Sequence, residues 1–129
     1  MMKKENVLPQ KYKEYFNQIF CLEVSEYLFD PLTALKNINK LLKRNGILWM
    51  SFCFIYPHHN PEGADMLRYT RWGVEKLLKE TGFEIEYVKS RVEREPDMLE
   101  SFYFKEGMHP CKTYDKHNET GYLIKAIKK

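Results

Sequence analysis

The segment from Tyr56 to Gly73, YPHHNPEGADMLRYTRWG, concentrates polar side chains that could take part in chemistry. It contains adjacent imidazoles at His58 and His59, the carboxylate of Asp65 and the guanidinium of Arg68. An imidazole titrates near neutral pH and can accept a proton, whereas a guanidinium binds carboxylates and phosphates through two parallel hydrogen bonds. The segment is therefore a candidate for binding and deprotonating a polar substrate.

The same segment offers too few ligands for a metal site. Adjacent histidines such as His58 and His59 seldom turn to one ion, because the backbone between them would have to distort. Further ligands would have to come from a later polar stretch, at His109, Cys111 or His117. We therefore predict no metal, and keep a small metal-binding protein as an alternative function.

Composition indicates one globular domain. The chain has 129 residues, of which 43% are hydrophobic and 30% charged, and its net charge is +3. Because basic and acidic residues are interleaved, no nucleic-acid partner is predicted. The three cysteines form no Cys-x-x-Cys pair and follow no apolar leader, so we expect a reducing cytoplasm. The longest apolar run, from Ile47 to Tyr56, is too short for the ~20 residues that cross a bilayer, and no membrane anchor is predicted.

A strand, a helix and a second strand are predicted before the polar segment. Residues 18–24 form a compact apolar run, and Asp30 with Pro31 supplies an N-cap followed by the proline favoured in the first helical turn. The helix should end near Asn45-Gly46, a pair that favours a left-handed conformation. Residues 47–55 are apolar on both faces, which predicts a central strand covered by helices on each side. These two strands should be parallel, with a right-handed crossover.

Beyond the polar segment, a second helix and two strands are expected. Thr70 is an N-cap residue, Gly82 marks the helix end, and Trp72 is assigned to the core. Alternation with glutamates then predicts a half-covered strand that buries three residues: Phe83, Ile85 and Tyr87. The polar stretch from 93 to 116 is an excursion of undefined structure, and residues 121–129 form a closing strand.

Several motifs occur together in one order: IFCLEVSEYLFDPLTALKNINKLLKRNGILWMSF, then the loop YPHHNPEGADMLRYT, then RWGVEKLLKETGFE. This order resembles the C-terminal half of class I S-adenosylmethionine-dependent methyltransferases. The resemblance implies an α/β fold with a partial Rossmann-like methyltransferase sheet and flanking helices. Its sheet would be a parallel βαβ unit followed by an antiparallel C-terminal strand pair. Residues 1–129 would then be a single truncated domain.

Three features depart from the family pattern. Arg44-Asn45-Gly46 stands where the family commonly has Pro-Gly-Gly, and Tyr27 stands where many members have histidine. The sequence also has no Gly-x-Gly-x-x-Gly loop, which approaches the cofactor in such folds. The resemblance therefore implies one wall of a cleft for S-adenosylmethionine, formed by three consecutive residues: Leu22, Glu23 and Val24. The alternative is that Leu22 and Val24 are ordinary core and Glu23 is a solvated strand end.

The resemblance implies methyl transfer to a small-molecule or glycan-like acceptor, which the chain alone would perform poorly. The loop would lie over the acceptor, with three residues matching a family arrangement for substrate binding: Asp65, Arg68 and Tyr69. His58 and His59 are candidate bases for removing a proton from the acceptor. An ion pair between Arg68 and Asp65 that only fixes the loop is an equal alternative.

The predicted sheet raises the question of a protein partner. Strand 18–24 would form an unprotected edge, which isolated proteins usually avoid. A homodimer or a partner chain covering this edge is therefore expected. The alternative function is a non-catalytic truncated remnant, or a subunit that needs a partner chain to complete the sheet.

Overall fold

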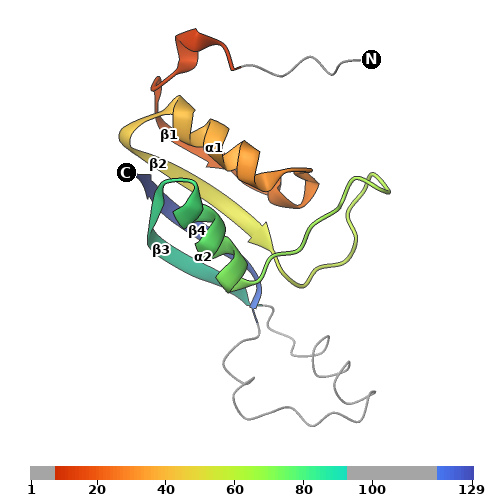
Figure 1. The fold of residues 1–129 in the computed structure, drawn as a ribbon. Helices are drawn as coiled ribbons and strands as arrows, with labels where there is room; N and C mark the ends of the chain where they lie inside the picture. The colour runs from red at the N-terminus through yellow and green to blue at the C-terminus, as the bar shows by residue number, and fades with distance from the viewer. Residues whose placement is uncertain (1–7, 93–118) are drawn as a thin grey trace, which may run out of the picture.

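The computed structural model describes residues 8–92 and 119–129, which form a four-stranded sheet with two α-helices (Figure 1). The strands are β1 (Phe16–Cys21), β2 (Leu42–Cys53), β3 (Phe83–Val92) and β4 (Glu119–Lys128). Their order in the sheet is β1-β2-β4-β3, with β1 and β2 parallel and the other pairs antiparallel. This arrangement confirms the predicted fold class. The later polar candidates lie outside the described residues: His109, Cys111 and His117.

Helix α1 (Pro31–Leu41) begins as predicted and ends earlier than predicted. Asp30 caps it by accepting a hydrogen bond from the Thr33 amide at 3.0 Å. The helix stops at Leu41 because Leu42, which is fully buried, already belongs to β2. The sheet register jumps across the next four residues, where Asn45 has a left-handed φ of 61°. The predicted helix end at Asn45-Gly46 is therefore an irregularity within a strand.

Helix α2 (Arg71–Glu80) is capped by Thr70, whose Oγ1 accepts a hydrogen bond from the Gly73 amide at 3.2 Å. Its inward stripe contains Val74 and Leu78, which are 1% and 0% exposed. Trp72 lies two positions before Val74, about 200° around the helix, and is 73% exposed. Its predicted place in the core is therefore wrong.

The core lies between the two helices and one face of the sheet. Alternate residues of β2 and β4 meet one residue of α1 and two of α2: Leu48, Met50, Phe52, Ile124, Ala126, Leu35, Val74 and Leu78. Gly121 lets β4 approach β2, since a Cβ there would lie 2.6 Å from the Phe52 carbonyl oxygen. This packing fixes the carboxyl end of β2, from which the polar loop departs.

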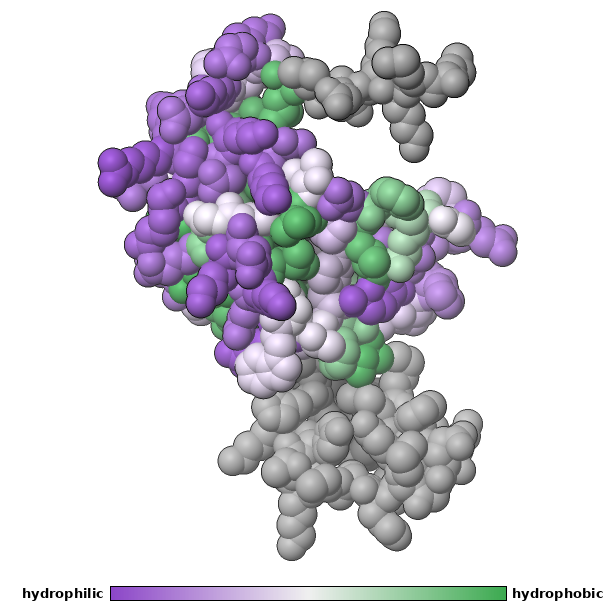
Figure 2. Space-filling model, viewed as in Figure 1, coloured by the Kyte–Doolittle hydropathy of each residue, from purple (hydrophilic) through white to green (hydrophobic). Residues whose placement is uncertain are grey.

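The opposite face of the sheet carries no helix of the residues that the structure describes. Both α1 and α2 lie on the same side (Figure 1), and their outer surface is largely hydrophilic (Figure 2). On the other side, the Phe20 and Trp49 rings stack with centroids 6.3 Å apart, and Phe20 is 66% exposed. The prediction of helices on both sides of strand 47–55 is therefore wrong within the described chain.

Strand β3 also departs from its predicted alternation. Its register with β4 shifts between Ile85 and Tyr87, which leaves Glu86 as an extra residue. Past this bulge the side chains exchange faces, so Val88 packs against the core and Tyr87 is 48% exposed. The predicted burial of Tyr87 is therefore wrong.

Candidate functional site

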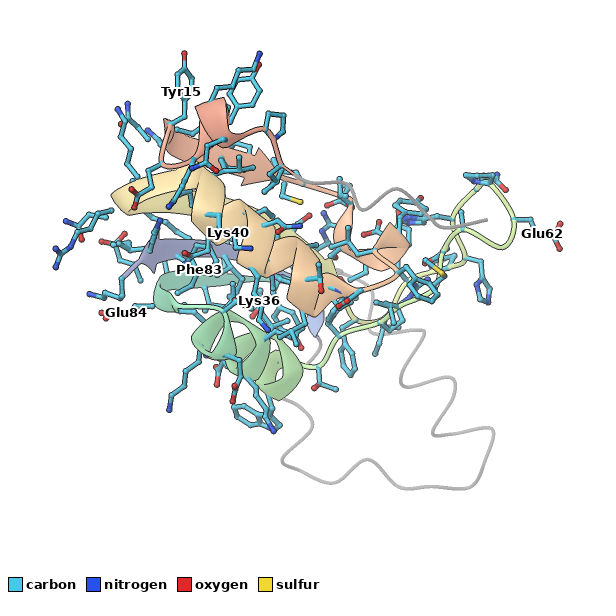
Figure 3. The ribbon with its side chains drawn as sticks, turned by 45° about the horizontal axis from the view of Figure 1, so that its top comes forward. Tyr15, Lys36, Lys40, Glu62, Phe83 and Glu84 are labelled. Carbon is cyan, nitrogen blue, oxygen red and sulfur yellow. The ribbon has the colours of Figure 1, made fainter. Side chains whose placement is uncertain are left out.

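The loop between β2 and α2 is fastened to a short 3-10 helix, η2 (Ser25–Tyr27), which follows β1. The Glu26 carbonyl oxygen accepts hydrogen bonds from the amides of Met66 and Leu67, at 2.9 and 3.1 Å. The Tyr69 hydroxyl donates to the Ser25 carbonyl oxygen at 2.7 Å. Glu62, at the loop tip, points away from the body of the protein (Figure 3). The base of the loop therefore lies at the carboxyl ends of the two parallel strands, where ligands bind in open α/β sheets.

Arg68 and Asp65 form a two-point ion pair inside this loop. Arg68 Nη1 donates to Asp65 Oδ1 at 2.5 Å, and Nη2 donates to Oδ2 at 2.7 Å. The Asp65 side chain is only 2% exposed and also accepts a hydrogen bond from the His59 amide at 2.8 Å. The Arg68 hydrogen bonds, followed by that of His59, hold the pKa of Asp65 well below its usual range. The structure thus shows the ion pair between Arg68 and Asp65 that was the alternative to substrate binding by Arg68.

The two adjacent histidines have different surroundings. The His58 side chain is 97% exposed and lies 4.0 Å from Asp65 Oδ2. His59 is partly buried, with its ring edge-to-face against Tyr56 at 4.5 Å between centroids. His59 Nδ1 lies 3.1 Å from the Tyr27 hydroxyl and 3.1 Å from Glu26 Oε1. His59 therefore lies closer to titratable groups than His58 does, and contacts two of them.

Two buried residues complete this neighbourhood and were not singled out from the sequence. Glu26 is fully buried and Cys53 is 3% exposed, and their ligand atoms lie within 4.8 Å of each other and of His59. Burial, followed by repulsion from Glu26, raises the pKa of the Cys53 thiol to about 11. One signal was available: Glu26 and Cys53 stand at the carboxyl ends of two strands predicted to be parallel neighbours, and such ends share one sheet edge.

The residues predicted to bind a cofactor lie at the end of β1. Leu22 and Val24 are 47% and 39% exposed, which differs from the core alternative. Between them, Glu23 has a left-handed φ of 54° and accepts hydrogen bonds from Ser51 Oγ at 3.0 Å and Arg91 Nη2 at 2.7 Å. Burial opposes ionisation of Glu23, but the hydrogen bonds from Arg91 and Ser51 outweigh it and lower the pKa.

A hollow of about 390 Å³ adjoins these residues. Its lining comes from β2, β3, β4 and the end of β1, and includes Leu22, Glu23, Ser51, Arg91 and Tyr122. Two of the three predicted cofactor residues therefore line one hollow. Of the three predicted substrate residues in the loop, Asp65 and Arg68 pair with each other, whereas Tyr69 contacts Ser25 and Phe52. Tyr69, one of these three, is 6% exposed.

Comparison with solved structures identifies the fold. An S-adenosylmethionine-dependent methyltransferase from Mesorhizobium loti matches 90% of this chain and 63% of its own length, with 12% identity and a TM-score of 0.62. The class I methyltransferase-like fold is thus established. Phosphoethanolamine N-methyltransferase 2 from Haemonchus contortus, solved with S-adenosyl-L-methionine, matches 90% of this chain and 34% of its own length, with 14% identity and a TM-score of 0.60.

Fold alone does not fix the reaction. The [4+2]-cyclase SpnF matches 90% of this chain and 50% of its own length, with 17% identity and a TM-score of 0.58. In all three comparisons the chain spans less than two thirds of the other protein. Protein-family models and curated proteins gave no significant match to the sequence. Among the described residues, no helix has the length and apolar character needed to span a membrane.

Proposed function

We propose that this chain takes part in S-adenosylmethionine-dependent methyl transfer to a small-molecule or glycan-like acceptor. In this proposal, residues 1–129 represent the C-terminal half of a methyltransferase domain. The observation that carries it is the hollow at the end of β1, lined by Leu22 and Glu23. The loop that contacts η2 leaves the carboxyl end of β2, the strand paired with β1. Methyltransferase-like topology places ligands at this end of the sheet.

The residues at the end of β1 fit one side of the cofactor. Leu22 and Val24 expose apolar side chains that can pack against a largely organic ligand, and Glu23 offers carboxylate oxygens held by Ser51 and Arg91. When bound, S-adenosylmethionine supplies a methyl group activated by a sulfonium. The chain's own contribution is to orient the two reactants and to exclude water from between them.

The loop supplies the acceptor side in this proposal. Asp65 and Tyr69 hold the loop in place, and Arg68, whose side chain is 29% exposed, presents part of its guanidinium to an anionic group of the acceptor. His58 and His59 are the candidate bases that accept a proton from an acceptor hydroxyl or amine. His58 is open to solvent, whereas His59 is held between Tyr56 and Glu26.

Titration of S-adenosylhomocysteine into the purified chain by calorimetry, with a thermal melt alongside, tests cofactor binding. We expect heat of binding and a raised melting temperature, because a ligand that binds only the folded state stabilises it. Leu22→Asp should weaken binding at least tenfold. Leu32→Asp is the matched control, since Leu32 is 37% exposed on α1, away from the hollow. Absence of binding, or equal effects of the two variants, would contradict the proposed cofactor wall.

A second candidate is a non-catalytic subunit that needs a partner chain or a second copy to complete the sheet. The observation in its favour is the open sheet face, where Phe20 is 66% exposed beside Trp49, together with the edge position of β1. Sedimentation of the purified chain, compared with Phe20→Asp, tests it. A dimer that dissociates in the variant supports this candidate, and a monomer that binds S-adenosylhomocysteine contradicts it.

A further inference from the structure

One carboxylate oxygen in the structure is buried without a hydrogen bond. Glu26 is fully buried, and its Oε1 has no hydrogen-bond partner among the described residues. His59 Nδ1 lies only 3.1 Å from this oxygen, but the geometry is not that of a hydrogen bond. Leaving a buried acceptor without a partner costs free energy, so such an atom calls for an explanation.

The atoms around this oxygen are of the kinds that bind metal ions. The carboxylate of Glu26, the sulfur of Cys53 and an imidazole nitrogen of His59 lie within 4.8 Å of one another. A tetrahedral Zn²⁺ with bonds of about 2.0–2.3 Å holds its ligands roughly 3.3–3.7 Å apart, so inward shifts of about 1 Å suffice. We propose that Glu26, Cys53 and His59 together bind one Zn²⁺ ion.

The donor set favours zinc over harder cations. Sulfur and imidazole nitrogen suit Zn²⁺, whereas Mg²⁺ and Ca²⁺ take oxygen ligands. A thiolate and a carboxylate balance the charge of the ion. As the zinc–sulfur bond forms, the Cys53 thiol releases its proton to solvent, and no electrons are exchanged. Three protein ligands leave a fourth position open to water or another small ligand, as in catalytic zinc sites.

The backbone around all three ligands is already fixed. Glu26 is held through its carbonyl oxygen by two amides of the loop, and the Cys53 carbonyl oxygen accepts a hydrogen bond from the Tyr69 amide at 2.8 Å. The His59 amide donates to Asp65 at 2.8 Å. Little backbone entropy is therefore lost when the ion binds. Zinc binding at this cluster does not require methyl transfer. In a chain with both functions, His59 is a zinc ligand and His58 is the remaining candidate base.

Zinc and cobalt binding to the full metal-free chain tests the site. We expect one Zn²⁺ per chain, a raised melting temperature with zinc, and a thiolate-to-cobalt charge-transfer absorption when Co²⁺ is bound. Cys53→Ser should abolish that absorption, and Cys53→Ser or His59→Ala should weaken zinc binding at least tenfold. Circular dichroism of the metal-free variants establishes that they still fold.

The matched controls are substitutions of a second cysteine, Cys21, and of His58, the neighbour of His59 in the sequence. Cys21→Ser and His58→Ala should leave zinc affinity and the cobalt spectrum unchanged, because neither belongs to the cluster. Cys111→Ser should also have no effect, which separates this site from one built by the later polar stretch. No zinc binding by the parent chain would overturn the proposal. A cobalt–thiolate absorption that survives in Cys53→Ser and disappears in Cys111→Ser would overturn it equally.

Discussion

The hydrogen bond from the Tyr69 hydroxyl joins the loop to η2 and should contribute measurably to the free energy of unfolding. Tyr69 is 6% exposed, its hydroxyl donates to the Ser25 carbonyl oxygen at 2.7 Å, and its ring meets Phe52 edge-to-face at 5.0 Å. Tyr69→Phe removes the hydroxyl and keeps the ring. The Ser25 carbonyl retains a second hydrogen bond, from the Leu28 amide at 3.3 Å, so the loss should be about 1 kcal/mol.

Urea unfolding of the parent, Tyr69→Phe and Tyr69→Ala measures this contribution. Removing the whole ring should cost about 3–5 kcal/mol, so the alanine variant should be several times more damaging than the phenylalanine variant. Tyr87→Phe, at a 48% exposed position on β3, should change stability by less than about 0.5 kcal/mol. A parent and a Tyr69→Phe variant of equal stability would refute the role given to the hydroxyl.

The same comparison has a predicted pH dependence. Burial, followed by repulsion from Glu26, raises the pKa of Tyr69 to about 12, compared with about 10 in an unfolded chain. Because the folded state disfavours the ionised phenol, the stabilisation provided by the protonated Tyr69 hydroxyl is fully present below pH ~10. It is lost as the pH rises towards ~12. The stability advantage of the parent over Tyr69→Phe should therefore shrink in that window. An advantage that stays constant to the top of the window would contradict the burial of the phenol.

Two further predictions concern β4 and the loop ion pair. Gly121→Ala should destabilise the fold by roughly 1–3 kcal/mol in urea unfolding, since a Cβ would lie 2.6 Å from the Phe52 carbonyl oxygen; an unchanged midpoint would contradict that close approach. Arg68→Lys should speed hydrogen exchange of the His59 amide severalfold, because lysine cannot pair with Asp65 at two points. The pKa of Asp65 is lowered, so its contribution is present above the unfolded value of ~3.9 and lost as the pH falls through the depressed folded value. In the parent chain, the protection of the His59 amide against hydrogen exchange should consequently be constant between about pH 5 and pH 8. A loss of protection within that range would show that the ion pair does not hold the loop.

Local chemistry in the sequence determines the helix starts. Asp30 and Thr70 were predicted as caps, and each accepts the expected amide hydrogen bond. The exposure of Trp72 also follows from local spacing, because Trp72 lies about 200° around α2 from the buried Val74. The position of Tyr87 depends instead on tertiary structure, since it follows a bulge that only pairing with β4 creates. That bulge leaves no local pattern in the sequence.

The candidate site was predicted only in part for a similar reason. The loop and the end of β1 could be recognised from consecutive residues, including His59 and Glu23. Glu26 and Cys53 are separated along the chain, and Cys53 falls within the predicted buried strand 47–55. Their convergence with His59 depends on the parallel pairing of β1 and β2 and on the path of the loop back over η2. Spatial neighbours of this kind follow from topology rather than from spacing.

The strand order has a consequence for how the chain folds during synthesis. β4 is the last strand of the described chain, yet it lies between β2 and β3, and its register joins Ile47 to Ile127. Until the ribosome has made β4, β2 can pair only with β1 among the described strands. The edge of β2 that later pairs with β4 is exposed during this time. Pairing between strands far apart in the sequence, such as β2 and β4, is slow. While it is incomplete, apolar strand edges can pair with other chains. Ribosome-bound chains that lack β4 should therefore be the species that chaperones recognise.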